Sequence, residues 1–124
     1  MKKQKFTYEA VVKDIHDGDT ITVEFDLGFN TKFTEKIRFY GINAPELRMR
    51  NEKNKLVENP KGTQTLEEVK KFLKVGDTIV IETIKDKKEK FGRYLGNVYV
   101  TVGEEQIKLN DYLLEMGFAE KLTY

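Results

Sequence analysis

Two short polar stretches gather oxygen-bearing side chains of the kind that bind a hard cation. The first is "DGDT" at 17–20 and the second is "INAPE" at 42–46. Asp19, Asn43 and Glu46 offer carboxylate and amide oxygens, which suit Ca²⁺ or Mg²⁺ far better than zinc or copper. A "DGD" turn is also common for backbone reasons alone, because Asp and Gly tolerate tight turns. The two stretches form a cation site only if the fold brings them together.

Two arginines could complete a site for phosphodiester hydrolysis. That reaction needs a cation on the phosphate, a group that orients or deprotonates water, and cationic donors for the transition-state charge. We predict Asp19 and Asn43 as cation ligands and Glu46 as the group that acts on water. Arg38 and Arg93 would donate bidentate hydrogen bonds to phosphate oxygens. An isolated arginine is usually a solvated surface group, so this prediction depends on the convergence of all five residues.

Five predicted strands and two predicted helices must position these residues. Period-2 alternation of apolar side chains marks a strand at 20–27 and puts Phe33, Ile37 and Phe39 on one side of a strand at 33–42. Further strands are predicted at 8–15, 77–84 and 94–102. A capping box at Thr65 and Glu68 predicts a helix that ends near Val75, and a second helix is predicted at about 109–116, before Gly117. The charged segment 47–62 has no period, and we predict an exposed, mobile loop there.

This order of elements predicts a mainly β fold with α (α+β), a five-stranded Greek-key barrel of the oligonucleotide-binding (OB) type with two or so helices. We expect a single domain over residues 1–124, because 124 residues with 39% hydrophobic content suit one compact core. The same fold hosts binders and enzymes, so it does not decide the function.

Composition excludes some chemistry and leaves other properties open. The chain has no cysteine, so it has neither disulfides nor a thiolate metal site. It shows no apolar run of the length of a signal-peptide core or a membrane span. We expect no membrane partner, a monomer, and a cytoplasmic location for the chain as given, or secretion if it is a processed product.

A net charge of +1 conceals two basic segments. Segments 48–61 and 85–93 each hold five Lys or Arg residues against two acidic ones, and they could follow a phosphate backbone or simply be solvated. Within the second segment we predict Lys90 as a substrate-binding residue. The candidates for base stacking are Tyr94, Tyr99, Phe118 and Tyr124, whereas Phe25, Phe33 and Phe39 are predicted to pack in the core. His16 is expected to be a surface or turn residue.

Four motifs in order carry a family resemblance: "DIHDGDT", "IRFYGINAPE", "KFGRYLGNVYV" and "LNDYLLEMGFA". Over about 110 residues the chain resembles the staphylococcal nuclease (thermonuclease) family. The resemblance implies an OB barrel that hydrolyses DNA and RNA with Ca²⁺ and leaves 3′-phosphorylated products. It implies that Asp19 binds the metal beside Asp17 and Thr20, that Arg38 and Arg93 bind phosphate, and that Glu46 is catalytic.

The chain departs from the family pattern at three positions. Asn43 stands where the family usually has an aspartate, which removes one negative charge and should weaken cation binding. Ala44 stands where threonine is frequent, and the resemblance implies that its backbone carbonyl is a metal ligand. Phe91 replaces a tyrosine that contacts the phosphate of the nucleotide, so we predict Phe91 as a substrate-binding residue that has lost one hydrogen bond.

Two functions of different class follow. The first is a Ca²⁺-dependent endonuclease acting on DNA, RNA or both, which is favoured because Asp19, Glu46 and both arginines are present. The second is a non-catalytic nuclease-like OB module that binds nucleic acid or a protein partner, and Asn43 is its main support.

Overall fold

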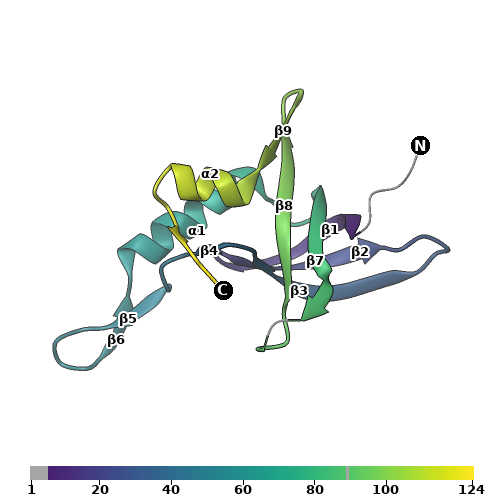
Figure 1. Cartoon of the computed structure of the whole chain (residues 1–124). Helices are drawn as coiled ribbons and strands as arrows, with labels where there is room; N and C mark the ends of the chain where they lie inside the picture. Colours follow the sequence, from purple (N-terminus) through teal and green to yellow (C-terminus); the bar gives the residue numbers. More distant parts are fainter. Residues whose placement is uncertain (1–5, 89) are drawn as a thin grey trace.

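A closed barrel of five strands forms the body of the protein (Figure 1). The computed structural model describes residues 6–88 and 90–124. The barrel strands are β1 (Thr7–Asp17), β2 (Thr20–Asp26), β3 (Lys32–Phe39), β7 (Thr78–Lys88) and β8 (Tyr94–Val102). Neighbours pair antiparallel in the order β3-β2-β1-β7-β8, and a parallel pairing of β3 with β8 closes the cylinder. The predicted fold class is confirmed.

Shorter elements extend the barrel on one side. β9 (Glu105–Lys108) forms a hairpin with β8 and leads into α2 (Leu109–Glu115). β4 (Ile42–Asn43) pairs with β10 (Glu120–Lys121), and β5 (Arg48–Arg50) pairs with β6 (Leu56–Glu58). The helix α1 (Pro60–Phe72) follows β6. Figure 1 shows both helices on the side of the barrel away from the β2–β3 hairpin.

The core fills the barrel and continues under the helices. The predicted alternation holds in β2, where Ile21, Val23 and Phe25 are buried. Val69 of α1 and Leu73 directly after it belong to the same buried cluster as Leu109 and Leu113 of α2. Among the described residues, no helix is long and apolar enough to cross a membrane.

The predicted start of the first helix was wrong. α1 begins at Pro60 and is capped by Asn59, whose side chain accepts a hydrogen bond from the Lys61 backbone N–H (3.3 Å). Proline suits the first helical position because its missing N–H would be unpaired there in any case. Thr65 and Glu68 have the spacing of a capping box, but they are buried inside the helix.

The irregular loop predicted at 47–62 is instead a β-hairpin that runs into α1. The Asn51 side chain closes the hairpin turn, because its Oδ1 accepts from the backbone N–H groups of Lys53 and Lys55 (2.9 Å each). At the base of the hairpin, the Asn59 N–H donates to the Leu47 carbonyl (2.8 Å). The hairpin strands are mostly exposed, as predicted for this segment.

Candidate active site

The turn between β1 and β2 places Asp19 against the chain that leaves β3. The Asp19 N–H donates to Asp17 Oδ1 (3.0 Å), which fixes the turn. Gly18 lies so close to its neighbours that an added Cβ would be 2.5 Å from Thr65 Cγ2 and 2.9 Å from Ala44 Cβ. The glycine of "DGDT" is therefore required by close packing against α1 and the corner after β4.

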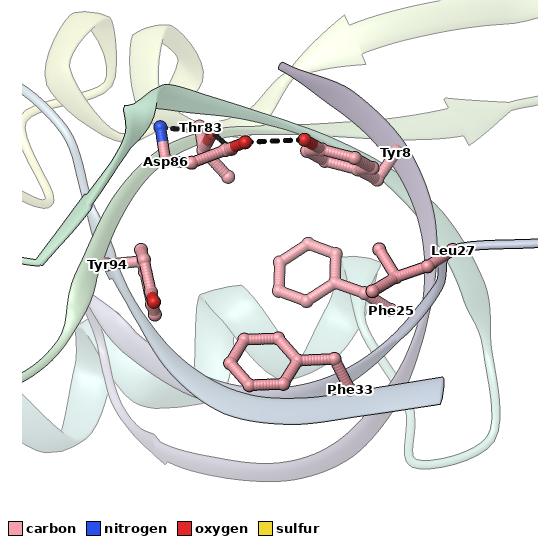
Figure 2. A pocket seen from close by; sticks show the side chains of 7 residues that line it. All are labelled: Tyr8, Phe25, Leu27, Phe33, Thr83, Asp86 and Tyr94. Carbon is pink, nitrogen blue, oxygen red and sulfur yellow. Dashed lines mark hydrogen bonds between the residues drawn. The ribbon is translucent and has the colours of Figure 1, made fainter. Parts of the chain in front are cut away.

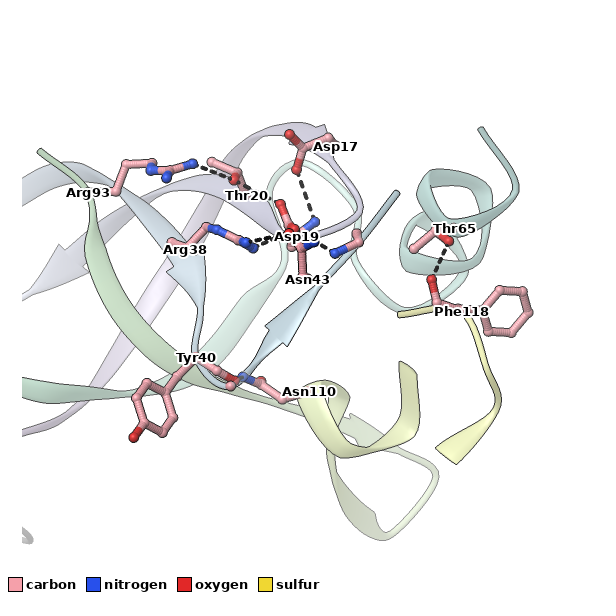
Figure 3. A network of polar contacts seen from close by, with 12 residues as sticks. Asp17, Asp19, Thr20, Arg38, Tyr40, Asn43, Thr65, Arg93, Asn110 and Phe118 are labelled. Atoms are coloured by element: carbon pink, nitrogen blue, oxygen red, sulfur yellow. Dashed lines mark hydrogen bonds and ion pairs between the residues drawn. The ribbon is translucent and has the colours of Figure 1, made fainter. Parts of the chain in front are cut away.

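The Asp19 carboxylate joins the two predicted stretches (Figure 3). Its Oδ2 accepts a hydrogen bond from the Ala44 N–H (2.8 Å), and its Oδ1 accepts one from Thr20 Oγ1 (3.2 Å). It also forms an ion pair with Arg38. Asp19 is only 7% exposed. The fold thus brings 17–20 and 42–46 together at one buried carboxylate.

Burial raises the pKa of Asp19 to about 6, and the hydrogen bond with Asp17 and its charge act in the same direction. The hydrogen bond from Ala44 and the charge of Arg38 oppose this rise in pKa without cancelling it. A further cation beside Asp19 would favour the ionised carboxylate. The site therefore holds an acidic group whose charge is only partly compensated by the protein.

Arg38 contacts both the Asp19 carboxylate and the Asn43 side chain. Its Nη2 donates to Asn43 Oδ1 (3.0 Å), and its Nη1 pairs with Asp19. Nη1 is buried and forms no hydrogen bond within the described residues, so charge rather than a well-directed hydrogen bond holds the pair. With a side chain only 11% exposed, Arg38 is not a solvated surface arginine.

We expect Arg38→Ala to lower the free energy of unfolding by about 3–5 kcal/mol, because it leaves the buried Asp19 carboxylate without its cation. Chemical denaturation of the purified protein measures this loss. Lys36→Ala is the matched control, since Lys36 is an exposed residue of the same strand. A loss no greater than that of Lys36→Ala would contradict the importance of the pair.

Arg93 approaches the same turn from the start of β8. Gly92 has a φ of 84°, which glycine adopts readily, and it turns the chain just before Arg93. Arg93 Nη1 donates to Thr20 Oγ1 (3.4 Å), and the guanidinium lies 5.6 Å from the centre of the Phe91 ring. Both predicted phosphate-binding arginines therefore reach the Asp19–Thr20 turn, as Figure 3 shows.

Glu46 lies beyond the network, three residues after Asn43. It is exposed, and within the described residues its side chain takes part in no hydrogen bond or ion pair. Its backbone, in contrast, is tightly packed, because a Cβ on Gly62 of α1 would lie 2.1 Å from the Glu46 carbonyl oxygen. The structure holds the backbone at Glu46 in place and leaves the side chain accessible.

Gly62→Ala is expected to destabilise the protein by about 1–3 kcal/mol, although Gly→Ala within a helix is normally stabilising. The added methyl group would collide with backbone atoms of Glu46 and Leu47, which cannot move independently. Thermal unfolding measures the effect, with Gln64→Ala at an exposed position of α1 as the control. Equal or higher stability of Gly62→Ala would show that this close contact is not required.

Comparison with known proteins bears directly on this arrangement. A family model described as staphylococcal nuclease homologue matches residues 36–124, which is more than half of the chain. The chain belongs to the staphylococcal nuclease family. It is 34% identical over 115 residues to endonuclease YhcR of Bacillus subtilis, and 33% identical over 125 residues to uncharacterized protein MJ1439 of Methanocaldococcus jannaschii. Each match covers 90% of this chain, but only 9% of the first relative and 58% of the second.

The predicted metal ligands of this chain are oxygen donors, the type that a hard cation prefers. Asp19 and Asn43 supply side-chain oxygens, both bridged by Arg38. The contact seen for Ala44 is made by its N–H, so the metal-binding role of its carbonyl stays a prediction. Within the described residues, no group of three or more His, Cys, Asp or Glu residues could hold a metal. The two predicted ligands thus offer a hard cation one carboxylate and one amide.

The predicted substrate-binding residues of the nuclease-family chain lie beside Arg93 and at the barrel end. Lys90 and Phe91 are exposed, with Lys90 Nζ 5.0 Å from the centre of the Phe91 ring. Tyr94 is half-buried. Of the three phenylalanines predicted to pack in the core, Phe25 and Phe39 are buried, whereas Phe33 is 39% exposed. That prediction was wrong for Phe33, because β2 and β3 extend past the closed part of the barrel.

Of the other predicted aromatic and imidazole residues, Tyr124 and His16 have side-chain partners. Tyr124 stacks on Tyr40 with ring centres 5.1 Å apart. Tyr99 and Phe118 are half-buried. His16 Nε2 lies 2.6 Å from Thr22 Oγ1, and His16 is half-buried in β1, close to the predicted turn.

Two buried polar residues that were not predicted to belong to the site support the corner after β3. Asn110 of α2 accepts from the Val98 N–H (2.8 Å) and donates to the Tyr40 carbonyl (2.9 Å), so it links helix, barrel and corner. Thr65 of α1 donates to the carbonyl of Phe118 (2.7 Å). At both positions the sequence shows a polar residue on the apolar face of a predicted helix. It does not show which distant backbone groups that residue contacts.

Proposed function

We propose that this chain is a Ca²⁺-dependent endonuclease that hydrolyses phosphodiester bonds of DNA, RNA or both. Membership of the nuclease family and the similarity to a protein named endonuclease support nuclease activity. The observation that carries the proposal is the convergence on Asp19, where the turn 17–20, Arg38 and the Ala44 N–H meet, while Arg93 contacts Thr20. Arg38 pairs with the buried Asp19 carboxylate and Arg93 reaches the adjacent Thr20, so two guanidinium groups lie at one turn.

In this proposal, the two arginines hold the phosphate. Arg38 and Arg93 each present a planar fork that matches two phosphate oxygens, and both approach the same side of the Asp19 turn. Their charge would stabilise the extra negative charge of the pentacoordinate transition state. In the structure Arg38 is held by Asp19 and Asn43, the side chains that would hold the cation, so cation binding would free the Arg38 guanidinium for the phosphate.

Glu46 would orient the attacking water and accept its proton. It is the exposed carboxylate next to the network, and its position beyond the corner leaves room for water and substrate. The bond that breaks joins phosphorus to the 5′ oxygen, so the products carry a 3′-phosphate and a 5′-hydroxyl group. Asp19 and Asn43 would hold Ca²⁺, which when bound polarises the phosphate.

Asn43→Asp is expected to lower the Ca²⁺ concentration required for half-maximal cleavage by about tenfold, because affinity at oxygen sites rises with ligand charge. The measurement is the initial cleavage rate across a Ca²⁺ series for both proteins. Asn54→Asp, in the exposed β5–β6 turn, controls for the change in net charge. An unchanged Ca²⁺ requirement would exclude Asn43 as a metal ligand.

A second candidate is a module that binds nucleic acid without cutting it. It is favoured by the low charge of the predicted metal site, and the Glu46 side chain forms no hydrogen bond or ion pair with the described network. In that case the arginines would bind phosphate, and added salt would weaken the complex with nucleic acid. No cleavage would occur.

Incubation with end-labelled single-stranded DNA, single-stranded RNA and duplex DNA tests the proposal. Each substrate is combined with Ca²⁺, with Mg²⁺ and with chelator. We expect fragments only when Ca²⁺ is present. Because each fragment should carry a 3′-phosphate, a polymerase should extend its 3′ end only after that phosphate has been removed. If all three nucleic acids bind in a salt-sensitive manner and no fragments form, the result would favour the non-catalytic module.

A further inference from the structure

The open end of the barrel contains an aromatic pocket that is separate from the Asp19 network (Figure 2). Its volume is about 320 Å³, and its lining includes Tyr8, Phe25, Phe33, Thr83, Asp86 and Tyr94. We infer that this pocket binds one unpaired base of a nucleic-acid strand whose phosphate lies at Arg93. The inference builds on the proposed function and defines its substrate as single-stranded, because a base within a duplex could not enter.

The walls of the pocket are aromatic rings, of which Phe33 is the most accessible. Phe25 and Phe33 lie nearly parallel, with ring centres 6.4 Å apart, and Tyr94 meets Phe33 edge-on at 6.1 Å. Phe33 is 39% exposed, and Leu27 at the rim is 40% exposed. Stacking on aromatic side chains is the principal means by which proteins bind unpaired bases.

A bulge in β7 shapes the polar side of the pocket. The pairing of β7 with β8 is irregular between Thr83 and Lys88, and Lys85 and Asp86 have φ values of 54° and 52°, which are uncommon for residues other than glycine. Asp86 accepts hydrogen bonds from the Tyr8 hydroxyl (2.6 Å) and from Thr83 Oγ1. The bulge thus turns a carboxylate toward the pocket, where it fixes the Tyr8 ring.

The position of the pocket favours a base as its occupant over an unrelated apolar group. Tyr94 directly follows Arg93, so the two residues lie next to each other in the chain at the start of β8. Arg93 contacts the Asp19 turn while Tyr94 lines the pocket. Lys88 Nζ lies 5.5 Å from the centre of the Tyr94 ring. Cations beside aromatic rings are the combination that holds the phosphates and bases of a single strand.

Fluorescence of a single-stranded oligodeoxynucleotide that carries one 2-aminopurine tests the inference. The titrations use the Glu46→Gln background with chelator, so that the strand stays intact. We expect quenching of the 2-aminopurine on binding, and Phe33→Leu should weaken binding about tenfold. Phe29→Leu is the matched control, because Phe29 is fully exposed in the same hairpin and lies outside the pocket lining.

Equal affinities of Phe33→Leu and Phe29→Leu for the oligonucleotide would overturn the inference. Leu27→Trp, which would obstruct the rim, provides a second variant if Phe33→Leu fails to fold, and it should also weaken binding. Cleavage by the chain without these substitutions is assayed in parallel. If the unsubstituted chain cleaves the strand but Phe33→Leu binds it normally, the pocket alone is refuted. If Phe33→Leu binds more weakly than Phe29→Leu but the unsubstituted chain does not cleave, the nuclease activity alone is refuted.

Discussion

Glu46→Gln is expected to slow cleavage of single-stranded DNA by about 10²- to 10⁴-fold, the usual contribution of a general base. The substitution keeps the size of the side chain and removes its ability to accept a proton. Glu46 is exposed, and no hydrogen bond or ion pair of the described residues depends on its side chain, so the unfolding midpoint should stay within the range of surface substitutions.

The measurement is the single-turnover rate at saturating Ca²⁺, together with thermal unfolding. Glu52→Gln is the matched control, because Glu52 is an exposed glutamate in the β5–β6 turn. Equal rates for Glu46→Gln and the unsubstituted chain would remove Glu46 from the mechanism. A slow but also unfolded variant would instead assign Glu46 a structural role.

Arg93→Ala is expected to slow cleavage by about 10²- to 10³-fold, which is the usual effect of removing one preorganised donor to a developing negative charge. The described polar contact of Arg93 with the turn is a long hydrogen bond to Thr20 Oγ1 (3.4 Å). The effect on stability should therefore be smaller than that of Arg38→Ala, which breaks a buried ion pair.

Arg93→Lys separates charge from geometry. It keeps the positive charge but loses the planar fork, so we expect its rate to lie between those of Arg93→Ala and the unsubstituted chain. The same single-turnover assay applies, with Arg48→Ala as the control at an exposed arginine. If Arg93→Ala cleaved as fast as Arg48→Ala, the assignment of Arg93 to phosphate would fail.

The strands next to the two polar stretches could be predicted from the sequence, because the first stretch precedes and the second follows a strand with clear alternation. Ile21 and Val23 mark β2, and Ile37 and Phe39 mark β3, so the barrel and its register follow from the apolar pattern. The register pairs Thr20 with Arg38, and this places the turn beside the arginine. The alternation therefore predicted the barrel, whereas the convergence at Asp19 depended on how these strands pair.

The mispredicted elements either lack an alternation of apolar residues or carry a sequence pattern typical of a different structure. The hairpin β5–β6 is exposed on both faces, so its side chains show no alternation. Thr65 and Glu68 have the spacing of a capping box, but Asn59 and Pro60 supply the actual helix start. Phe33 follows the core alternation of β3, yet it lies where the strand passes the end of the barrel.

Contacts between distant segments were beyond prediction from one sequence. Nothing in the local pattern shows that Asn110 reaches the Tyr40 carbonyl, or that Gly18 packs against Thr65. Likewise, the pairing of β4 with β10 depends on the return of the chain after α2. Such contacts fix the corner that carries Asn43 and Glu46, so the precision of the site is a property of the tertiary structure.

Single-turnover cleavage of one end-labelled single strand, started with Ca²⁺ and then stopped with chelator, tests the central claim most directly. The account predicts that cleavage begins when Ca²⁺ is added, ends when chelator is added, and leaves 3′-phosphate termini. Absence of cleavage at every Ca²⁺ concentration, with salt-sensitive binding of the same strand intact, would contradict it. The corner around Asp19 would then bind phosphate without cutting the strand.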